Sequence, residues 1–489
     1  MARAGHREAT GEGLRIAAAR AFFQRKRRCA GSRLAHLSVM DSLLPDAADR
    51  AVRYLEGLSI RAVRPLPAAV AALRALDEPL PVGPSDPAAT LRLLDDVGSP
   101  ATMGMAGPRF FGFVIGGTLP VALAANWLAG AWDQNTAFYQ STPSAAHLEQ
   151  VALRWLLDVL RLPAHCGGAF VTGATVANFC ALAAARHTVL ARVGWNVEAQ
   201  GLFGAPPITV IVGEEVHPSV TKSLGLLGFG RTRVIKVPVD GQGRMRADRL
   251  PVVSGPTIVC IQAGNVNTGA CDPIAEICRA VHAAGGWVHV DGAFGLWAAA
   301  APAHAGWLTG IEEADSWATD AHKWLNVPYD SGLAFVRDAE ALRAAMAITA
   351  DYLPAPTEFR APADYTPELS RRARGVEIWA VLRSLGRAGL AELITRNCAQ
   401  ARRFAERLSA AGYEILNDVV LNQVLVSFGE PEKTKRVIQA VQEEGTCWAG
   451  ITLWQGRTAM RISVSSWATT DADVERSVAV MVRIAQATR

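Results

Sequence analysis

The middle of the chain contains seven short, mainly apolar runs, and helix-like segments separate them. The runs are Ala169–Val171, Ile208–Val212, Val234–Val237, Ile258–Ile261, Trp287–Val290, Ser316–Thr319 and Leu333–Val336. Near-continuous apolarity, without the alternation of a half-exposed strand, is typical of strands buried on both faces of a parallel sheet. The pattern predicts a three-layer α/β domain with a mostly parallel, seven-stranded sheet. In such sheets ligands bind at the carboxyl ends of the strands.

The segments on either side of this domain differ from it. Apolar residues between Leu43 and Leu58 follow helical spacing, which predicts a helical arm before the domain. After the domain, Gln423–Ser427 and Met460–Val464 have the pattern of strands, which predicts a small α+β domain. The predicted division is 1–39 as a basic, disordered extension, 40–95 as the helical arm, 96–345 as the large domain and 346–489 as the small domain.

The basic character of the chain is confined to its first residues. Residues 1–39 hold nine Lys and Arg against two Glu, whereas residues 40–489 hold 40 basic and 43 acidic side chains. The run Arg25–Arg28 suits nucleic-acid contact or organelle targeting, but an untranslated or unstructured extension before Met40 explains it more simply. We therefore expect no nucleic-acid partner.

Hydropathy and cysteine spacing indicate in which cellular compartment the protein works. The sequence contains no run of about 18 or more uninterrupted apolar residues, which predicts no membrane span. No apolar segment follows the basic cluster, so a secretory signal is not expected. The eight cysteines form no Cys-x-x-Cys pair, which indicates reduced thiols in a cytoplasmic protein and no zinc site.

Two reactive side chains follow strands of the predicted sheet. Lys323 lies just after the sixth run, and Asp291 ends the fifth. Desolvation at the mouth of an apolar strand favours the neutral amine, and a buried carboxylate needs a partner. Alone, each has a simpler explanation, as a surface lysine or a helix N-cap. Together they offer the Schiff-base amine and the pyridinium partner that pyridoxal phosphate requires.

Two further segments fit such a site. Thr172–Asn178 opens a helix directly after the first strand, and its small residues would let the helix N-terminus approach a phosphate. The hydroxyl of Thr175 would add a donor. His217 follows the second strand and offers a flat imidazole to a ring. Ordinary strand–helix turn chemistry and a structural histidine are the alternatives.

In these motifs and their order the chain resembles the pyridoxal-phosphate-dependent group II decarboxylases, which include aromatic-amino-acid, glutamate and histidine decarboxylases. The resemblance runs from about residue 50 to the end and rests on Gly173–Asn178, His217–Ser219, Gly264–Asp272, His289–Asp291, Asp320–Trp324 and Ser370–Arg372 with Trp379. It implies the fold type I architecture of pyridoxal-phosphate-dependent transferases. It also implies pyridoxal 5'-phosphate as the cofactor, no metal, and a homodimer with a shared active site.

The resemblance further implies roles for the cofactor site. Lys323 would hold the cofactor covalently, and Asp291 would pair with its ring nitrogen. His217 and Ala293 would pack on the two faces of the ring. Ala174, Thr175 and His322 would hold the phosphate, Asp320 would lie close by, and Asn265 would replace a threonine that contacts the cofactor in the family.

For the reaction, the resemblance implies decarboxylation of an L-amino acid to the corresponding amine and CO2. Lys323, His217 and Tyr352 would take part in catalysis, and Phe113, Val114 and Arg371 would bind the substrate. An aminotransferase or a Cα–Cβ lyase on the same fold is the alternative, and a cofactor-binding scaffold without turnover is another. The sequence does not name the amino acid, although the aromatic residues around Phe113 favour an apolar or aromatic side chain.

Overall fold

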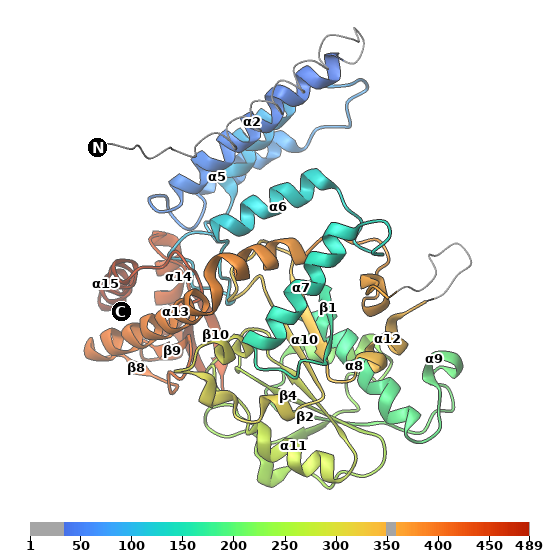
Figure 1. Ribbon diagram of the computed structural model, residues 1–489. Helices are drawn as coiled ribbons and strands as arrows, with labels where there is room; N and C mark the ends of the chain where they lie inside the picture. The colour runs from blue at the N-terminus through green and yellow to red at the C-terminus, as the bar shows by residue number, and fades with distance from the viewer. Residues whose placement is uncertain (1–33, 349–357, 489) are drawn as a thin grey trace, which may run out of the picture. The chain divides into compact units, whose positions relative to one another are not determined.

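A computed structural model describes residues 34–348 and 358–488, so the predicted Tyr352 lies outside the described residues. The chain divides into two compact units. The first comprises the residues up to Gly57 and Pro65–Thr102, and the second comprises Leu58–Arg64 and the residues from Met103 onward. Figure 1 labels the elements of both units.

The first unit is helical. Its helices are α2 (Leu34–Gly57), α3 (Pro67–Ala72), α4 (Pro87–Leu93) and α5 (Ser99–Ala101). Arg50 of α2 pairs with Asp95 at 2.9 Å. None of the apolar side chains described in this unit is buried, so the unit has no hydrophobic core of its own. The boundaries expected at residues 40, 96 and 346 remain predictions.

A seven-stranded sheet forms the centre of the second unit. Its order is β1-β7-β6-β5-β4-β2-β3, with β1 (Gly167–Val171), β2 (Thr209–Gly213), β3 (Ile235–Val237), β4 (Thr257–Gln262), β5 (Trp287–Asp291), β6 (Ser316–Asp320) and β7 (Gly332–Val336). Only β7 runs antiparallel to its neighbours. These strands coincide with the seven apolar runs, which confirms the mostly parallel sheet predicted from the sequence.

Helices cover both faces of this sheet (Figure 1). Successive strand residues point to opposite faces, and in β4 Ile258 and Cys260 join one hydrophobic cluster while Val259 and Ile261 join the other. The first cluster includes α8 (Ala174–Ala191), α10 (Pro218–Leu226) and α12 (Ala339–Met346), and the second includes α7 (Pro143–Val159), α11 (Ile274–Ala283) and the first part of α13 (Gly375–Ala410). Burial on both faces explains the continuous apolarity of the strands.

A smaller antiparallel sheet follows, in the order β10-β11-β9-β8. Its strands are β8 (Glu414–Ile415), β9 (Gln423–Ser427), β10 (Gly450–Trp454) and β11 (Arg457–Ser463), and the second part of α13, α14 (Pro431–Glu444) and α15 (Asp471–Ala487) pack on it. Gly386, with φ of 59°, interrupts the helical geometry of α13. The strands predicted at 423–427 and 460–464 correspond to β9 and β11, whereas β8 and β10 were not predicted.

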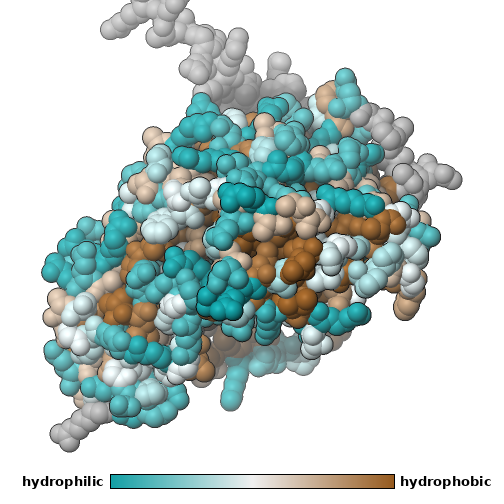
Figure 2. Space-filling view, turned by 90° about the horizontal axis from the view of Figure 1, so that it is seen from below, coloured by the Kyte–Doolittle hydropathy of each residue, from teal (hydrophilic) through white to brown (hydrophobic). Residues whose placement is uncertain are grey.

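Surface and thiol properties complete the description. Across residues 34–348 and 358–488, no helix is both long and apolar enough to cross a membrane. The seven cysteines in these ranges are free thiols and all are buried. Apolar side chains also reach the surface: Figure 2 shows brown patches among the hydrophilic residues of one face. Helix α6 (Pro120–Trp132) exposes Trp127, Leu128 and Trp132.

Candidate active site

A cavity of about 320 Å³ lies where several strands of the large sheet end. It is lined by Thr172, Gly173, Ala174, Thr175, Val176, His217, Ser219, Ala293, Asp320, His322 and Lys323. Seven of these are predicted site residues, namely Ala174, Thr175, His217, Ala293, Asp320, His322 and Lys323. The volume falls within the range of about 300–1,000 Å³ that small-molecule sites occupy.

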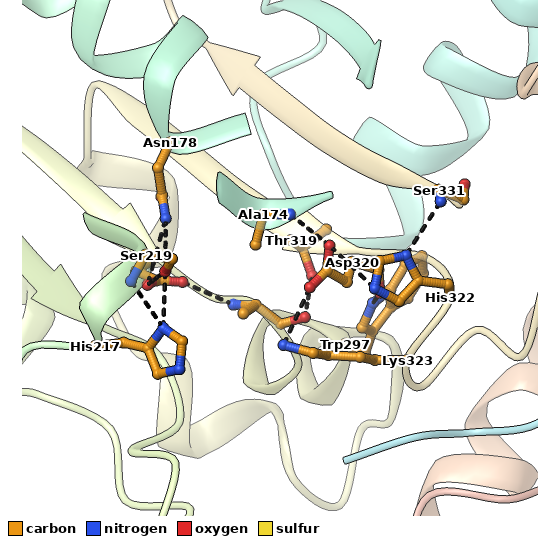
Figure 3. Close-up of polar contacts among 12 residues, drawn as sticks. Ala174, Asn178, His217, Ser219, Trp297, Thr319, Asp320, His322, Lys323 and Ser331 are labelled. Atoms are coloured by element: carbon orange, nitrogen blue, oxygen red, sulfur yellow. Dashed lines mark hydrogen bonds and ion pairs between the residues drawn. The ribbon is translucent and has the colours of Figure 1, made fainter. Parts of the chain in front are cut away.

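Lys323 lies three residues beyond the end of β6. Its Nζ is 3.0 Å from Oδ2 of Asp320, and Oδ1 of the same carboxylate accepts a hydrogen bond of 2.6 Å from the amide of Ala174 (Figure 3). The backbone of Lys323 is supported from the other side by Gly116, where an added Cβ would collide with the Lys323 carbonyl. Asp320 therefore joins the reactive amine to the beginning of α8.

Asp291 ends β5, and only 4% of its surface is exposed. Its Oδ1 accepts a hydrogen bond of 3.2 Å from the amide of Ala293. Its Oδ2 lies 3.5 Å from Nδ2 of Asn178 and 3.4 Å from Oγ of Ser219. These donors are all neutral, and among the residues that the structure describes no Lys, Arg or His side chain forms an ion pair with Asp291. A buried carboxylate of this kind suits a cationic group that a ligand brings.

His217 is the N-cap of α10. Its Nδ1 accepts a hydrogen bond of 3.2 Å from the amide of Ser219, so the other ring nitrogen carries the proton in the neutral form. Burial lowers the pKa of His217; the charge of Asp291 raises it, and those of Lys323 and Arg461 lower it. The side chain is thus kept as a neutral, flat ring beside the cavity.

The N-terminus of α8 faces the same cavity. Its N-cap, Gly173, has no side chain that could bond the first amides. Ala174 lines the cavity, but its amide bonds Asp320, so the expected phosphate contact of Ala174 stays a prediction. The amides of Thr175 and Val176 remain as anion donors, because the first amides of a helix have no partner within it.

His322 lines the same cavity, beside Gly173. Its Nδ1 accepts a hydrogen bond of 3.1 Å from the amide of Ser331, and its Nε2 lies 3.6 Å from Asp320. The ring of Tyr329 stacks on it at 4.3 Å. Burial lowers the pKa of His322, so the ring offers one N–H, from Nε2, toward the cavity side of Asp320.

Arg371 is predicted to bind a substrate carboxylate, but the structure does not bring it to the cavity. Its side chain is fully buried and donates to Oε2 of Glu149 at 2.8 and 2.7 Å. It also donates to the carbonyls of Thr136 and Phe170. Because Glu149 already neutralises the guanidinium, Arg371 is a structural cation here. The sequence could not reveal this partner, which lies 222 residues away.

Asn265 is also absent from the cavity lining. Its Nδ2 donates to Glu215 at 3.0 Å. Its Oδ1 accepts hydrogen bonds from the amides of Asn267 and Thr268. Both ends of the amide therefore fix a turn, and the expected cofactor contact of Asn265 stays a prediction.

The two predicted substrate residues of the aromatic loop, Val114 and Phe113, differ in their exposure. Val114 is 1% exposed and belongs to the main hydrophobic core, so its side chain does not face a ligand. Phe113 is 58% exposed and lies against Trp448 with ring centroids 5.3 Å apart. Trp448 also stacks on Phe110 at 5.0 Å. A three-ring cluster, Phe110–Trp448–Phe113, results, and Trp448 was not predicted from the sequence.

Arg461 of β11 is a second residue that was not predicted. Burial lowers the pKa of Arg461, and its charge acts on His217. Its NH1 donates to the carbonyl of Val266 at 3.3 Å. Within the described part of the chain it has no carboxylate partner. In the sequence it is one residue of an ordinary strand pattern, so no local signal marks it.

The donor set around the cavity fits pyridoxal phosphate. The cofactor needs an amine, a carboxylate for a protonated ring nitrogen, a flat neighbour for the ring and an anion site for the phosphate. Lys323, His217 and the first turn of α8 line the cavity and fit three of these needs, and Asp291, which bonds the lining residues Ala293 and Ser219, fits the fourth. The decisive observation is Asp291, whose buried charge lacks a cationic partner among the described side chains.

Comparisons with known proteins agree with this geometry. The model of the pyridoxal-dependent decarboxylase conserved domain matches residues 86–429. Tryptophan decarboxylase 1 of Oryza sativa subsp. japonica is 26% identical over 401 residues, 74% of this chain and 77% of that protein. L-2,4-diaminobutyrate decarboxylase of Rhizobium meliloti (strain 1021) is 33% identical over 324 residues, 62% of each. The crystal structure of Oryza sativa TDC with PLP and tryptamine superposes with a TM-score of 0.85 at 23% identity, covering 92% of this chain and 98% of that one. Other matching relatives are named as aldehyde synthases.

Proposed function

The chain belongs to the pyridoxal-dependent decarboxylase family, and from this premise we propose that it converts an L-amino acid into the corresponding amine and CO2. As a member of this family, the protein is a pyridoxal-phosphate-dependent carboxy-lyase that acts on an amino acid. The observation that carries the proposal is that the Lys323 amine and the neutral His217 line one cavity, while the cation-free Asp291 bonds two of its lining residues, Ser219 and Ala293. Membership in this family favours decarboxylation over aminotransfer, Cα–Cβ cleavage or a scaffold without turnover.

In this proposal the protein groups have separate tasks. Pyridoxal phosphate, when bound, supplies a ring that accepts the electron pair left behind by CO2. Lys323 would hold the cofactor covalently until a substrate amine takes its place, and Asp320, whose Oδ2 lies 3.0 Å from Nζ, would hold the lysine amine in position. Asp291 keeps a proton on the ring nitrogen. His217 and Ala293 would pack on the ring faces, and the amides of Thr175 and Val176 with His322 would bind the phosphate.

We assign the substrate carboxylate to Arg461 rather than to Arg371. Arg461 is a cation without a carboxylate partner in the described chain, and it lies near enough to His217 to shift its pKa. Holding the carboxylate there would orient the Cα–carboxylate bond for cleavage. Replacing Arg461 by Met should raise KM about tenfold or more, the worth of a hydrogen-bonded charge pair. An unchanged KM would contradict the assignment.

Formation of an amine requires that a proton returns to Cα. Tyr352 remains the proposed donor, although it lies outside the described residues. An aldehyde product would require that Cα is oxidised instead of protonated. Tyr352→Phe should therefore lower amine formation without weakening cofactor binding, whereas equal amine yield from this variant would exclude Tyr352 as the donor.

The oligomer we propose is a cytoplasmic homodimer. The helical arm buries none of its described apolar side chains, and α6 exposes Trp127, Leu128 and Trp132. Surfaces of this kind are typical of chains that pack against a second subunit. Light scattering at micromolar concentration should give a mass of two chains, about 104 kDa from 52.0 kDa each.

For the substrate we propose an amino acid with an aromatic or large apolar side chain, because the exposed Phe113 packs on Trp448, which in turn stacks on the buried Phe110. The test is mass spectrometry of the products after the reconstituted enzyme meets a pool of amino acids without added oxo acid. An amine from an aromatic amino acid supports the proposal. An aldehyde with ammonia, or an oxo acid with aminated cofactor, would replace the proposed reaction.

A further inference from the structure

A chain of buried polar side chains leads from the interior of the sheet to Asp291. Nε1 of Trp287 donates to Oγ of Ser316 at 2.9 Å, and Oγ of Ser316 lies 2.9 Å from Nδ1 of His289. Nε2 of His289 lies 2.8 Å from Oδ1 of Asn178. Nδ2 of Asn178 faces Asp291 at 3.5 Å. The first four of these residues are almost fully buried, so water does not replace any of the bonds.

The direction of every hydrogen bond follows from the chemistry of its ends. The indole of Trp287 can only donate, so Oγ of Ser316 accepts from it and directs its own hydrogen to His289 Nδ1. His289 then carries its proton on Nε2 and donates to Oδ1 of Asn178. The amide of Asn178 is thereby turned with its NH2 group toward Asp291 and Ser219, which lies 3.3 Å away. Figure 3 shows Asn178 directed at Ser219.

The neutrality of His289 is required by this arrangement. Burial lowers the pKa of His289 to about 3, so a single N–H is present at neutral pH. A charged imidazole would donate from both nitrogens and would oppose the hydrogen of Ser316. Since β5 carries both Trp287 and His289, and β6 carries Ser316, the sheet itself fixes the spacing of the first three members.

We propose that Trp287, Ser316, His289 and Asn178 form a positioning relay that holds the NH2 group of Asn178 against Asp291 and so orients that carboxylate for the cofactor ring nitrogen. Without the His289 donor, the Asn178 amide is free to turn its oxygen toward Asp291, and two oxygens would then face each other. Only the catalytic consequence of the relay rests on the proposed function. Its effect on cofactor affinity does not depend on the reaction.

Two substitutions of His289 distinguish the loss of its hydrogen-bond donor from a change in side-chain packing. In His289→Gln the side-chain amide nitrogen lies near the place of Nε2 and can still donate to Asn178, whereas His289→Leu removes the donor and keeps an apolar filler. Ser477→Ala, which deletes a buried hydroxyl that bonds the Asp473 carbonyl in α15, is the control for loss of a buried hydrogen bond. The readouts are the dissociation constant of pyridoxal phosphate on the apoprotein, kcat and KM for the substrate, and the urea midpoint.

We expect His289→Leu to raise the cofactor dissociation constant and to lower kcat by about tenfold or more, the effect of one hydrogen bond to a charged group, with KM changed less than about threefold. His289→Gln and Ser477→Ala should stay within about threefold of the unmodified protein on each measure. Equal values for the Leu and Gln variants, whether both normal or both impaired, would overturn the relay.

A second variant covers the case in which His289→Leu does not fold. Ser316→Ala removes only a hydroxyl and leaves the tautomer of His289 unspecified, so cofactor affinity should fall between the unmodified protein and the Leu variant. Ser316→Thr should restore it, and the absence of any loss in Ser316→Ala would count against the relay. If the unmodified protein binds the cofactor but forms no amine, the proposed function fails while the affinity comparison still decides the relay.

Discussion

Replacing Arg371 by Met should destabilise the protein rather than weaken substrate binding. The guanidinium makes two hydrogen bonds to Glu149, at 2.8 and 2.7 Å, and one each to two carbonyls, at 3.0 and 3.1 Å, with both ionic side chains fully buried. Glu149 would keep only Arg360, at 2.7 Å. Removing one partner of a buried pair costs about 3–5 kcal/mol, and the free energy of unfolding should fall by that amount.

The assay is urea unfolding of the apoprotein followed by tryptophan fluorescence, together with steady-state kinetics. Arg407→Met is the matched control, because Arg407 pairs with Glu475 at the surface and such pairs contribute about 1 kcal/mol or less. The double variant Arg371→Met with Glu149→Gln should recover part of the loss, since no uncompensated charge remains. An unchanged urea midpoint combined with a large rise in KM would refute this reasoning and restore Arg371 as a substrate ligand.

Three further outcomes follow. Asp291→Asn should weaken cofactor binding about tenfold or more in an absorbance titration. The urea midpoint of the apoprotein should stay near that of the unmodified chain, because the groups that donate hydrogen bonds to residue 291 are neutral. Burial raises the pKa of Asp272 to about 6 from 3.8; its contribution to stability is therefore present at low pH and lost as pH rises. Relative to Asp272→Asn, the unfolding free energy should fall by up to about 3 kcal/mol between about pH 4 and pH 7, and a rise would contradict this. Trp448→Ala should lower kcat/KM for aromatic substrates more than for small ones, since Phe110 and Phe113 lose the ring between them; equal losses would exclude a role in specificity.

The large sheet was predictable because most of its strands are buried on both faces and are therefore mainly apolar, although the edge strand β3 is exposed at Ile235 and Lys236. Strand β10 was not predictable for the opposite reason. Its Ile451 and Leu453 are exposed while Gly450 and Trp454 are buried, so its pattern matches neither a buried strand nor the usual half-exposed one. Strand β8 has only two residues, too few for any period to be visible.

The residues of the candidate site that directly follow strands could be predicted from the sequence. Lys323, His217 and Ala293 follow strand ends, and the topology brings such ends together. Charge pairing was not predictable, because a sequence gives the type of a side chain but not its partner. Arg371 is neutralised by Glu149 of α7, whereas Arg461, in an unremarkable strand, keeps its charge available. Asn265 resembles a cofactor ligand in sequence and is a turn residue in space.

The two aspartates of the site show how burial and pairing assign different tasks to the same side chain. Asp320 bonds the Lys323 amine and the first amide of α8, so its charge is balanced by the protein before any ligand arrives. Asp291 is equally buried but receives only neutral donors, and the relay through Asn178 and His289 orients one of them. A carboxylate in that state gains most from a cationic partner. The charge that the protein leaves uncompensated therefore lies at Asp291, which is why we propose this position as the partner of a protonated ring nitrogen.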